Sequence, residues 1–258
     1  MIEKKFGIIG KPLSHSLSPF LHNFWFKKYK IFAKYSLIEI EPDEIEGIIK
    51  KIKSEELHGI NVTVPYKQAV IPFLDLILNN AKQTSSVNTI NLNKEGKVVG
   101  NNTDVYGLEH GFIKQLDYQN LNHNSVLILG AGGVTPSVIY ALSTKGIKNV
   151  FISNRTIKKA EYIKKMFPFI KIVKWENLET VIGKMDIIIN ATSLGLKGGD
   201  NFKQEFKYIK PTLVYYDVIY NPEETRLMKL ASERGAKTLN GYKMLELQAE
   251  KSWSIWHS

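Results

Sequence analysis

Residues 59–67 contain the side chains best suited to acid–base chemistry. Apolar residues alternate there with Asn61 and Thr63, a pattern typical of a strand. We expect the strand to end at Pro65, which cannot donate to a sheet ladder, and a helix to begin at Pro65 or the next residue. Lys67 would then stand in a first helical turn, where a cation opposes the helix dipole. Lys67 is therefore a candidate for a chemical role, and a solvated surface lysine is the alternative.

The amide of Asn61 and the hydroxyl of Thr63 would share one face of this strand. Buried polar groups need hydrogen-bond partners, and open α/β sheets bind ligands at the carboxyl ends of their strands. We therefore expect both side chains to contact a polar ligand.

A glycine-rich turn in residues 125–133 is the second candidate site. The apolar run before it predicts a buried strand, and a helix is expected from about Thr135. This order of strand, turn and helix is typical of dinucleotide binding, in which Gly130 allows the tight turn and Gly132 lets the backbone approach a pyrophosphate. Thr135 stands where a third glycine is usual. Pro136 restricts the helix start to this point, because proline is tolerated only in a first turn.

The strand predicted at residues 149–153 ends in a basic loop. In an NAD site, an acidic residue about 20 positions beyond the glycine turn accepts hydrogen bonds from the ribose hydroxyls. This chain offers Arg155 there, followed by Lys158 and Lys159. A guanidinium binds a 2′-phosphate that a carboxylate would repel. These residues favour NADP over NAD, and a surface arginine is the alternative.

Residues 14–19 place several hydroxyls before a predicted helix. We expect Ser18 to be the N-cap and Pro19 the first helical residue. Exposed N–H groups and the positive end of the helix dipole make such a start an anion site, so Ser16 and Ser18 could hold a carboxylate. His15 is expected to be structural or solvated.

Two further polar residues lie next to a predicted hairpin. Its strands are expected at residues 86–92 and 97–100, around a turn at 93–96. Asn88 lies in the first of these strands, where an ordinary strand-edge asparagine is the alternative to a binding role. Asp104 precedes a helix, where the alternative is an N-cap.

The surrounding elements predict an α/β protein. Strands alternate with helices in the first quarter of the chain, which indicates a mostly parallel sheet. The expected strands are 6–9, 35–40 and 59–64, with helices from Pro19 and Pro42. A helix broken at Pro72 is expected at residues 69–78.

The second half of the chain continues in the same way after a polar connector at residues 114–124. The strand predicted at residues 186–193 ends in small polar residues, and its Thr192 and Ser193 would lie near a cofactor. The remaining predicted elements are a strand at 213–220, a helix at 223–234 and a last amphipathic helix after Gly241.

The composition limits the class of protein. The 258 residues contain no cysteine, which excludes disulfides and thiolate metal sites, and none of the six histidines lies in a ligand-like cluster, so we expect no bound metal. No apolar run is long enough to span a membrane or to form a signal-peptide core, and we expect a cytoplasmic protein. The net charge of +10 indicates anionic partners. Because the lysines are scattered without a basic tract, we expect no nucleic-acid partner.

The motifs of this chain resemble those of the shikimate dehydrogenases, a family of NADP-linked enzymes of the chorismate pathway. The resemblance covers nearly the whole chain. The segments that carry it are residues 14–19 with His22 and Asn23, 61–67, 87–89, 102–104, 130–133, 154–156, 190–193, 217–222, and 244–245 with Gln248.

The resemblance implies roles for individual residues. Lys67 and Asp104 would be the catalytic pair, and Ser16 and Ser18 would bind the substrate carboxylate. The residues that would hold the rest of the substrate, chiefly its ring hydroxyls, are Asn61, Thr63, Asn88, Asp104, Tyr220 and Gln248. The cofactor site would be lined by Gly130, Ala131, Gly132, Gly133, Val134, Asn154, Arg155, Thr156, Lys158, Lys159, Val218 and Gly241, together with Thr192 and Ser193.

The fold of this family consists of two α/β domains, with the last helix returning to the first domain. The resemblance therefore implies a substrate-binding domain at residues 1–103 and 240–258 and a Rossmann-like NADP-binding domain at 104–239. The implied reaction is the reversible reduction of 3-dehydroshikimate by NADPH, in which the Lys67 ammonium stabilises and protonates the nascent alkoxide. We expect a monomer or a homodimer.

Other hypotheses stay open. The nearest is a quinate/shikimate dehydrogenase with relaxed choice of substrate and cofactor. Another two-domain Rossmann enzyme, such as a methylenetetrahydrofolate dehydrogenase, would give no reason for the paired serines. A non-catalytic shikimate-binding protein would not need both Lys67 and Asp104. A basic nucleic-acid module would show a steeply salt-dependent affinity for DNA.

Overall fold

The chain folds into two compact units, each built around its own sheet. The computed structural model describes residues 2–116, 123–196 and 199–258, so most of the predicted connector at 114–124 lies outside the described residues. The first unit comprises Met1–Tyr106 and Glu246–Ser258, and the second comprises Gly107–Leu245. Asp104 thus belongs to the first unit and residues 240–245 to the second, a few residues away from the boundaries expected from the sequence.

The sheet of the first unit is mostly parallel, as predicted. Its strands are β1 (Lys4–Gly10), β2 (Ala33–Glu39), β3 (Gly59–Val62), β4 (Leu76–Ile77), β5 (Thr89–Leu92) and β6 (Val98–Asn101). Their order is β2-β1-β3-β5-β6-β4. The pairs β1–β2, β1–β3 and β4–β6 are parallel, whereas β3–β5 and the predicted hairpin β5–β6 are antiparallel. In this arrangement β3, which carries Asn61, is a central strand.

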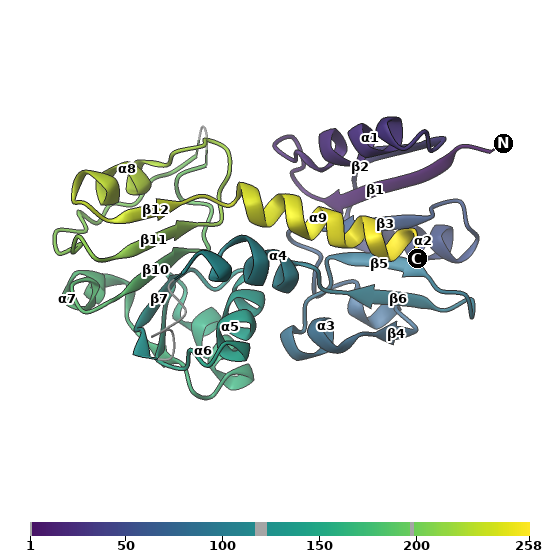
Figure 1. Ribbon diagram of the computed structural model, residues 1–258. Coiled ribbons are helices and arrows are strands. Elements are labelled where there is room, and N and C mark those ends of the chain that lie inside the picture. The colour runs from purple at the N-terminus through teal and green to yellow at the C-terminus, as the bar shows by residue number, and fades with distance from the viewer. Residues whose placement is uncertain (1, 117–122, 197–198) are drawn as a thin grey trace. The chain divides into compact units, whose positions relative to one another are not determined.

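Helices cover the sheet of the first unit with apolar faces. They are α1 (Ser18–Lys28), α2 (Ile45–Lys53) and α3 (Asn79–Thr84), with short 3-10 turns at Pro42–Glu44 and Ile71–Phe73. The buried residues of α2 recur at helical spacing and join the core around Ile60 and Ile90. The C-terminal part of α9 (Tyr242–Trp256) lies along β3 and β5 (Figure 1), where the indole N–H of Trp256 donates to the carbonyl of Ile90 over 3.2 Å.

The helices expected after β3 do not form. Residues 65–70 make turns, and the segment 69–78 contains only the 3-10 turn Ile71–Phe73 followed by β4. Turn bonds and tertiary hydrogen bonds replace a regular helix. The N–H of Tyr66 donates to the Thr63 carbonyl in a local turn, its buried hydroxyl donates to the carbonyl of Ile40, and the Lys67 carbonyl accepts from the N–H of Val87. Lys67 is therefore held in a turn beside the sheet.

The second unit has the strand order of a doubly wound nucleotide-binding fold. Its strands are β7 (Val126–Leu129), β8 (Val150–Ser153), β9 (Lys171–Ile172), β10 (Ile187–Asn190), β11 (Val214–Asp217) and β12 (Lys237–Leu239). The order β12-β11-β10-β7-β8-β9 is parallel throughout. It places the reversal of strand order at β7, which is the strand before the glycine turn, as in Rossmann folds.

The helices of the second unit bury both faces of this sheet. They are α5 (Thr135–Thr144), α6 (Ile157–Met166), α7 (Leu178–Ile182) and α8 (Arg226–Glu233), with 3-10 turns at Ile113–Gln115 and Trp175–Asn177. Every residue of β7 and β10 is buried, as expected for parallel strands covered on both sides. The two unit boundaries fall within α4 (Asp104–Gly111) and α9. No helix in the described part of the chain is long and apolar enough to cross a membrane.

His22 is a buried histidine in an aromatic cluster of the first unit. Its ring stacks on Tyr35, with centroids 4.4 Å apart and planes inclined by 7°, and Trp25 and Trp256 lie at 5.2 and 5.1 Å. Neither ring nitrogen has a hydrogen-bond partner among the described residues. Burial, aided by the nearby His257, lowers the pKa of His22 to about 3. His22 is therefore neutral at physiological pH and packs as an aromatic ring.

We expect His22 to make the first unit sensitive to acid. The unfolded chain takes up a proton near the ordinary pKa of 6.5, but the folded chain takes it up only near about 3. The free energy of unfolding should therefore fall by roughly 1.4 kcal/mol for each pH unit within that window. Replacing His22→Phe keeps the stacked ring and loses no hydrogen bond, so it should remove this dependence.

Urea unfolding at about pH 7 and about pH 4.5 measures the effect. His15→Gln, which removes an exposed histidine, is the matched control and should retain the wild-type dependence. Equal acid sensitivity of the wild type and His22→Phe would contradict the assignment.

Candidate active site

Lys67 and Asp104 form a buried ion pair in the first unit. The Nζ atom of Lys67 lies 2.6 Å from Oδ2 of Asp104, and the two side chains are only 12% and 7% exposed. Lys67 comes from the turn after β3, and Asp104 is the first residue of α4, where a carboxylate is favoured by the helix dipole. The fold thus brings together two residues that are 37 positions apart in the chain.

Asn88 holds the other oxygen of the Asp104 carboxylate. Its Nδ2 donates to Oδ1 of Asp104 over 2.9 Å. The N–H of Thr103 donates to Oδ1 of Asn88 over 2.8 Å, and because a main-chain N–H can only donate, this bond decides which way round the amide lies. The side chain of Gln248, on α9, contacts Nδ2 of Asn88 at 3.4 Å. Both carboxylate oxygens of Asp104 are therefore engaged by partners with fixed orientation.

A cluster of three buried hydroxyls supports these groups and was not foreseen from the sequence. Thr89 and Ser252 lie 2.7 Å apart, and Thr103 lies 3.3 Å from Thr89 and 3.2 Å from Ser252. The signals for them are weak: Thr89 directly follows Asn88, and Ser252 is one helical turn beyond Gln248 in an apolar pattern. This spacing brings Gln248 and Ser252 to the same group of polar residues only when α9 packs on the sheet.

Asn61 on β3 and Thr63 just after it differ in burial and in how far protein atoms already engage their side chains. Asn61 is buried, and its Nδ2 donates to the Asn88 carbonyl at 3.0 Å, to Thr89 at 3.1 Å and to Ser252 at 3.0 Å. Thr63 is half-buried and packs directly over Gly10, where a side chain would collide with its methyl group. The polar atoms of Asn61 are thus committed to protein partners, and its contact with a ligand stays a prediction.

The start of α1 differs by one position from the sequence-based expectation. The helix begins at Ser18, its N-cap residue is Leu17, and no side chain caps it. Ser18 is therefore in the first turn with Pro19, and the Ser18 N–H donates to the hydroxyl of Ser16 over 3.3 Å. Proline is tolerated at the second helical position because no intrahelical partner is lost there. The half-buried Ser16 and the buried Ser18 still lie together at the helix start.

The remaining predicted substrate residues lie in both units. Gln248 is 9% exposed and belongs to the first unit, with Ser16, Ser18, Asn61, Thr63, Lys67, Asn88 and Asp104. Tyr220 follows β11 in the second unit and is half-buried.

The glycine turn has the conformation that its sequence predicts. Gly130 adopts a φ of +107°, and a side chain there would lie 2.9 Å from the Ala191 carbonyl oxygen. At Gly132 an added Cβ would meet only that same oxygen, at 3.8 Å, so space is left beside the turn. Helix α5 begins at Thr135, as expected, and the Thr135 hydroxyl donates to the Gly130 carbonyl over 3.1 Å. The residue that replaces the usual third glycine therefore closes the turn.

The basic loop after β8 is bonded to the glycine turn. The N–H of Ala131 donates to Oδ1 of Asn154 over 3.1 Å, and Nδ2 of Asn154 donates to the Thr156 carbonyl over 2.9 Å. The cations of this loop, Arg155, Lys158 and Lys159, are exposed.

The basic loop and the glycine turn together fit NADP. None of the three loop cations takes part in an ion pair among the described residues. Open space at Gly132, the start of α5 and unpaired cations on the adjoining loop suit a pyrophosphate and a 2′-phosphate.

The strand ends next to the glycine turn meet at a buried carboxylate. Asn190 donates to Asp217 over 3.0 Å and accepts from the Thr192 hydroxyl over 2.7 Å. Burial raises the pKa of Asp217 to about 6, while hydrogen bonds from the Ile219 N–H, Asn190, Thr225 and Tyr215 oppose this rise. Asp217 was not among the predicted site residues, although a carboxylate inside an apolar strand is a recognisable signal.

The other predicted cofactor residues surround this point. Ser193 is exposed, and Gly241 packs against the carbonyl of Val218 so closely that any side chain at 241 would collide with it. The loop Thr192–Ser193, the Val218 backbone and Gly241 are thus held near the carboxyl ends of β10 and β11.

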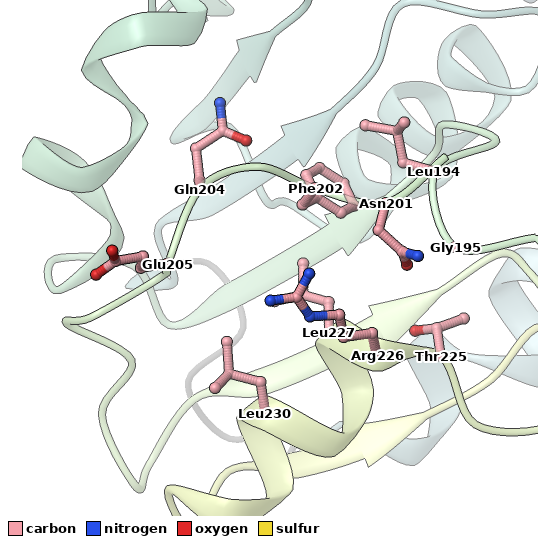
Figure 2. A pocket seen from close by; sticks show the side chains of 10 residues that line it. All are labelled: Leu194, Gly195, Asn201, Phe202, Gln204, Glu205, Thr225, Arg226, Leu227 and Leu230. Atoms are coloured by element: carbon pink, nitrogen blue, oxygen red, sulfur yellow. The ribbon is translucent and has the colours of Figure 1, made fainter. Parts of the chain in front are cut away.

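A separate pocket of about 240 Å³ lies in the second unit between the chain after β10 and the start of α8. Figure 2 shows Gln204 and Glu205 on one side and Arg226 on the other, with Leu194, Phe202 and Leu230 as apolar lining. None of the predicted substrate or cofactor residues lines this pocket.

Comparisons with known proteins agree on one family. Residues 8–90 match the model of the shikimate dehydrogenase substrate binding domain, and residues 113–196 match that of shikimate / quinate 5-dehydrogenase. The NADP(+) shikimate dehydrogenase of Pelagibacter ubique is 46% identical over 99% of this chain and 94% of its own length.

Solved structures of this family superpose on nearly the whole chain. The crystal structure of shikimate dehydrogenase from Aquifex aeolicus has a TM-score of 0.90 at 40% identity, with 99% of this chain and 94% of that chain covered. The Thermus thermophilus enzyme, solved with NADP(H) and shikimate, has a TM-score of 0.86 at 28% identity, covering 98% and 93%. The fold class of two α/β units with a returning last helix, predicted from the sequence, is confirmed.

Two neighbouring glycines should separate folding from cofactor binding. Gly130→Ala forces a side chain onto a backbone with positive φ and against the Ala191 carbonyl, so we expect a loss of roughly 1–3 kcal/mol in stability. Gly132→Ala meets no close protein atom, so its stability should change by less than about 0.5 kcal/mol, yet its methyl group would fill the space meant for a pyrophosphate.

Thermal unfolding without cofactor and calorimetric titration with NADP measure the two effects. We expect Gly132→Ala to weaken NADP binding by about tenfold or more while its melting temperature stays near that of the wild type. Full NADP affinity of Gly132→Ala would show that the turn does not hold the cofactor.

Proposed function

We propose that this chain, which belongs to the shikimate dehydrogenase family, catalyses the reversible NADPH-dependent reduction of 3-dehydroshikimate to shikimate. The observation that carries the proposal is the buried Lys67–Asp104 pair, with Nζ and Oδ2 2.6 Å apart and the carboxylate oriented by Asn88. An ammonium held in this way can stabilise and protonate an oxygen that gains negative charge.

The residues of the chain supply the proton side of the reaction. NADPH, when bound, supplies the hydride that adds to the ketone carbon of 3-dehydroshikimate. As the C=O π bond opens, Lys67 donates one proton from its ammonium to the oxygen, which gives the alcohol. Asp104 keeps Nζ in place for the transfer. In the reverse direction the Lys67 amine takes the proton from the hydroxyl.

The substrate would be held mainly by polar groups of the first unit. We assign the carboxylate to the hydroxyls of Ser16 and Ser18 at the start of α1, where the positive end of the helix dipole favours an anion. The ring hydroxyls are assigned to a set of side chains that offer both donors and acceptors: Asn61, Thr63, Asn88, Asp104, Tyr220 and Gln248.

The second unit would bind NADP. The turn Gly130, Ala131, Gly132, Gly133 and Val134 would receive the pyrophosphate at the start of α5, and the loop of Asn154, Arg155, Thr156, Lys158 and Lys159 would receive the 2′-phosphate. Thr192, Ser193, Val218 and Gly241 would complete the site at the ends of β10 and β11. The cytoplasmic location and the choice between monomer and homodimer stay predictions.

A relaxed quinate/shikimate dehydrogenase is the second candidate, because one matching family model describes both activities. Steady-state assays of shikimate and quinate oxidation, each with NADP and NAD, distinguish the two. We expect shikimate with NADP to give the highest kcat/KM.

Removing the Lys67 ammonium should abolish most of the turnover. Lys67→Ala should lower kcat for shikimate oxidation by roughly 10²-fold or more, the usual scale for a positioned acid–base group. The rate of NADPH formation measures it, and Lys82→Ala, at an exposed lysine of the same unit, is the control. A kcat near that of the wild type would reject the role of Lys67.

Removing the Arg155 guanidinium should narrow the preference for NADP over NAD. Arg155→Ala should lower kcat/KM for NADP by about tenfold or more, because a charge-assisted contact to the 2′-phosphate is lost, and leave that for NAD within about twofold. Lys165→Ala, on an exposed position of α6, should leave the ratio unchanged. An unaltered ratio in Arg155→Ala would remove Arg155 from the cofactor site.

A further inference from the structure

Tyr35 has no role in the site described above, yet its hydroxyl is bonded to two of the site residues, Asn61 and Ser18. Tyr35 lies on β2, is 2% exposed, and stacks on the ring of His22. Its main-chain N–H donates to Oδ1 of Asn23 over 2.9 Å, and its carbonyl accepts from Nδ2 of Asn23 over 2.9 Å. Helix α1 therefore fixes both the ring and the backbone of Tyr35, and the hydroxyl has one position.

The hydroxyl of Tyr35 donates to Oδ1 of Asn61 over 2.7 Å. The direction follows from the other bonds of Asn61. Its Nδ2 lies 3.0 Å from the main-chain carbonyl of Asn88, which can only accept, so Nδ2 must face Asn88 and Oδ1 must face Tyr35. Tyr35 is thus the donor that Oδ1 of Asn61 requires in this orientation.

From Asn61 the hydrogen bonds continue to the catalytic pair. Asn61 holds the peptide carbonyl of Asn88, which also accepts from the N–H of Val62 over 2.9 Å. The side chain of the same Asn88 donates to Asp104 over 2.9 Å, and Asp104 holds Lys67. A continuous buried path of directional bonds therefore joins the Tyr35 hydroxyl to the Lys67 ammonium.

We propose that Tyr35 is a positioning residue for the reaction: by donating to Asn61, it keeps the Asn88 peptide, and through it Asp104 and Lys67, in the orientation for proton transfer. The inference rests on the proposed function. Without the hydroxyl, Oδ1 of Asn61 becomes a buried acceptor without a donor, which is costly. Rotation of the amide would turn Oδ1 toward the hydroxyls of Thr89 and Ser252, and the bond to the Asn88 carbonyl would be lost.

Tyr35→Phe tests this idea because it removes only one oxygen and keeps the stacked ring. We expect kcat for shikimate oxidation to fall about tenfold because the catalytic pair is misaligned, and KM to rise as well because Asn61 and Asn88 are also assigned to the ring hydroxyls. Tyr29→Phe is the control: it also removes one tyrosine hydroxyl of the first unit, but at an exposed position at the end of α1, away from the catalytic pair. An equal fall of kcat in both variants would overturn the inference.

The Lys67→Ala background separates positioning from a general loss of packing. If Tyr35 acts through the pair, adding Tyr35→Phe to Lys67→Ala should lower kcat by less than about twofold further. A further fall of about tenfold would show that Tyr35 acts on turnover by another route and would overturn the proposal.

Hydrogen exchange of the Asn88 side-chain amide gives a readout that needs no turnover. NMR should show that these protons exchange about tenfold faster or more in Tyr35→Phe than in the wild type or Tyr29→Phe. Unchanged exchange would reject the role of Tyr35 even in an active enzyme. If the wild-type protein does not oxidise shikimate but exchange is still faster in Tyr35→Phe than in the wild type, the path of hydrogen bonds is upheld and only the proposed function is rejected.

Discussion

The attraction between the Lys67 ammonium and the Asp104 carboxylate is the interaction around which the first unit is arranged. Taking two charges out of water costs several kcal/mol for each ion, and the pair is tolerated only where further hydrogen bonds satisfy the remaining donors and acceptors. Asn88 supplies such a bond to Asp104, and its own amide is oriented by the Thr103 N–H. The polar interior therefore has one arrangement, because exchanging any donor for an acceptor would leave a buried group unpaired.

Secondary structure from distant parts of the chain is needed to complete this arrangement. Strand β3 contributes Asn61, β5 contributes Thr89, and α9 contributes Gln248 and Ser252. The return of α9 to the first unit is therefore more than a packing device: without it, Nδ2 of Asn61 and the hydroxyls of Thr89 and Thr103 would lose a shared partner, Ser252. Trp256 fastens the same helix to the sheet through the Ile90 carbonyl.

The second unit differs from the first in that its glycine turn leaves space for an anion. Glycines keep the turn after β7 free of side chains, and the cations of the adjoining loop have no carboxylate partners among the described residues. Its own buried carboxylate, Asp217, is directed inward, where four donors hold it. The buried carboxylate of this unit is thus held by hydrogen-bond donors, whereas the cations of the loop beside the glycine turn lack carboxylate partners among the described residues.

Local chemistry explains where prediction from the sequence succeeded and where it was wrong. The start of α5 at Thr135 and the hairpin β5–β6 follow from Pro136 and the turn at 93–96, which act over a few residues. The prediction of a helix at Pro65 was wrong because Tyr66 and Lys67 bond to Ile40 and Val87, which are at least 20 positions away in the chain. Ser18 was expected to be the cap of α1, but the helix begins at that residue. The short elements α3 and β12 were not foreseen. Helix α3 has six residues and strand β12 has three, and β12 depends on its pairing with β11.

The amino-acid sequence by itself determined the alternation of strands and helices, the glycine turn, the preference for a phosphorylated dinucleotide and the membership of the family, because each depends on residue types at fixed spacing. Only the tertiary structure decided which polar residues meet. Residue type and spacing do not reveal the hydrogen-bond partners of Tyr35, Thr89, Thr103 and Ser252. Their importance arises from buried hydrogen bonds between elements far apart in the chain. Hydrogen bonding is directional and short-ranged, so its partners are defined only after the strands and α9 have been brought together.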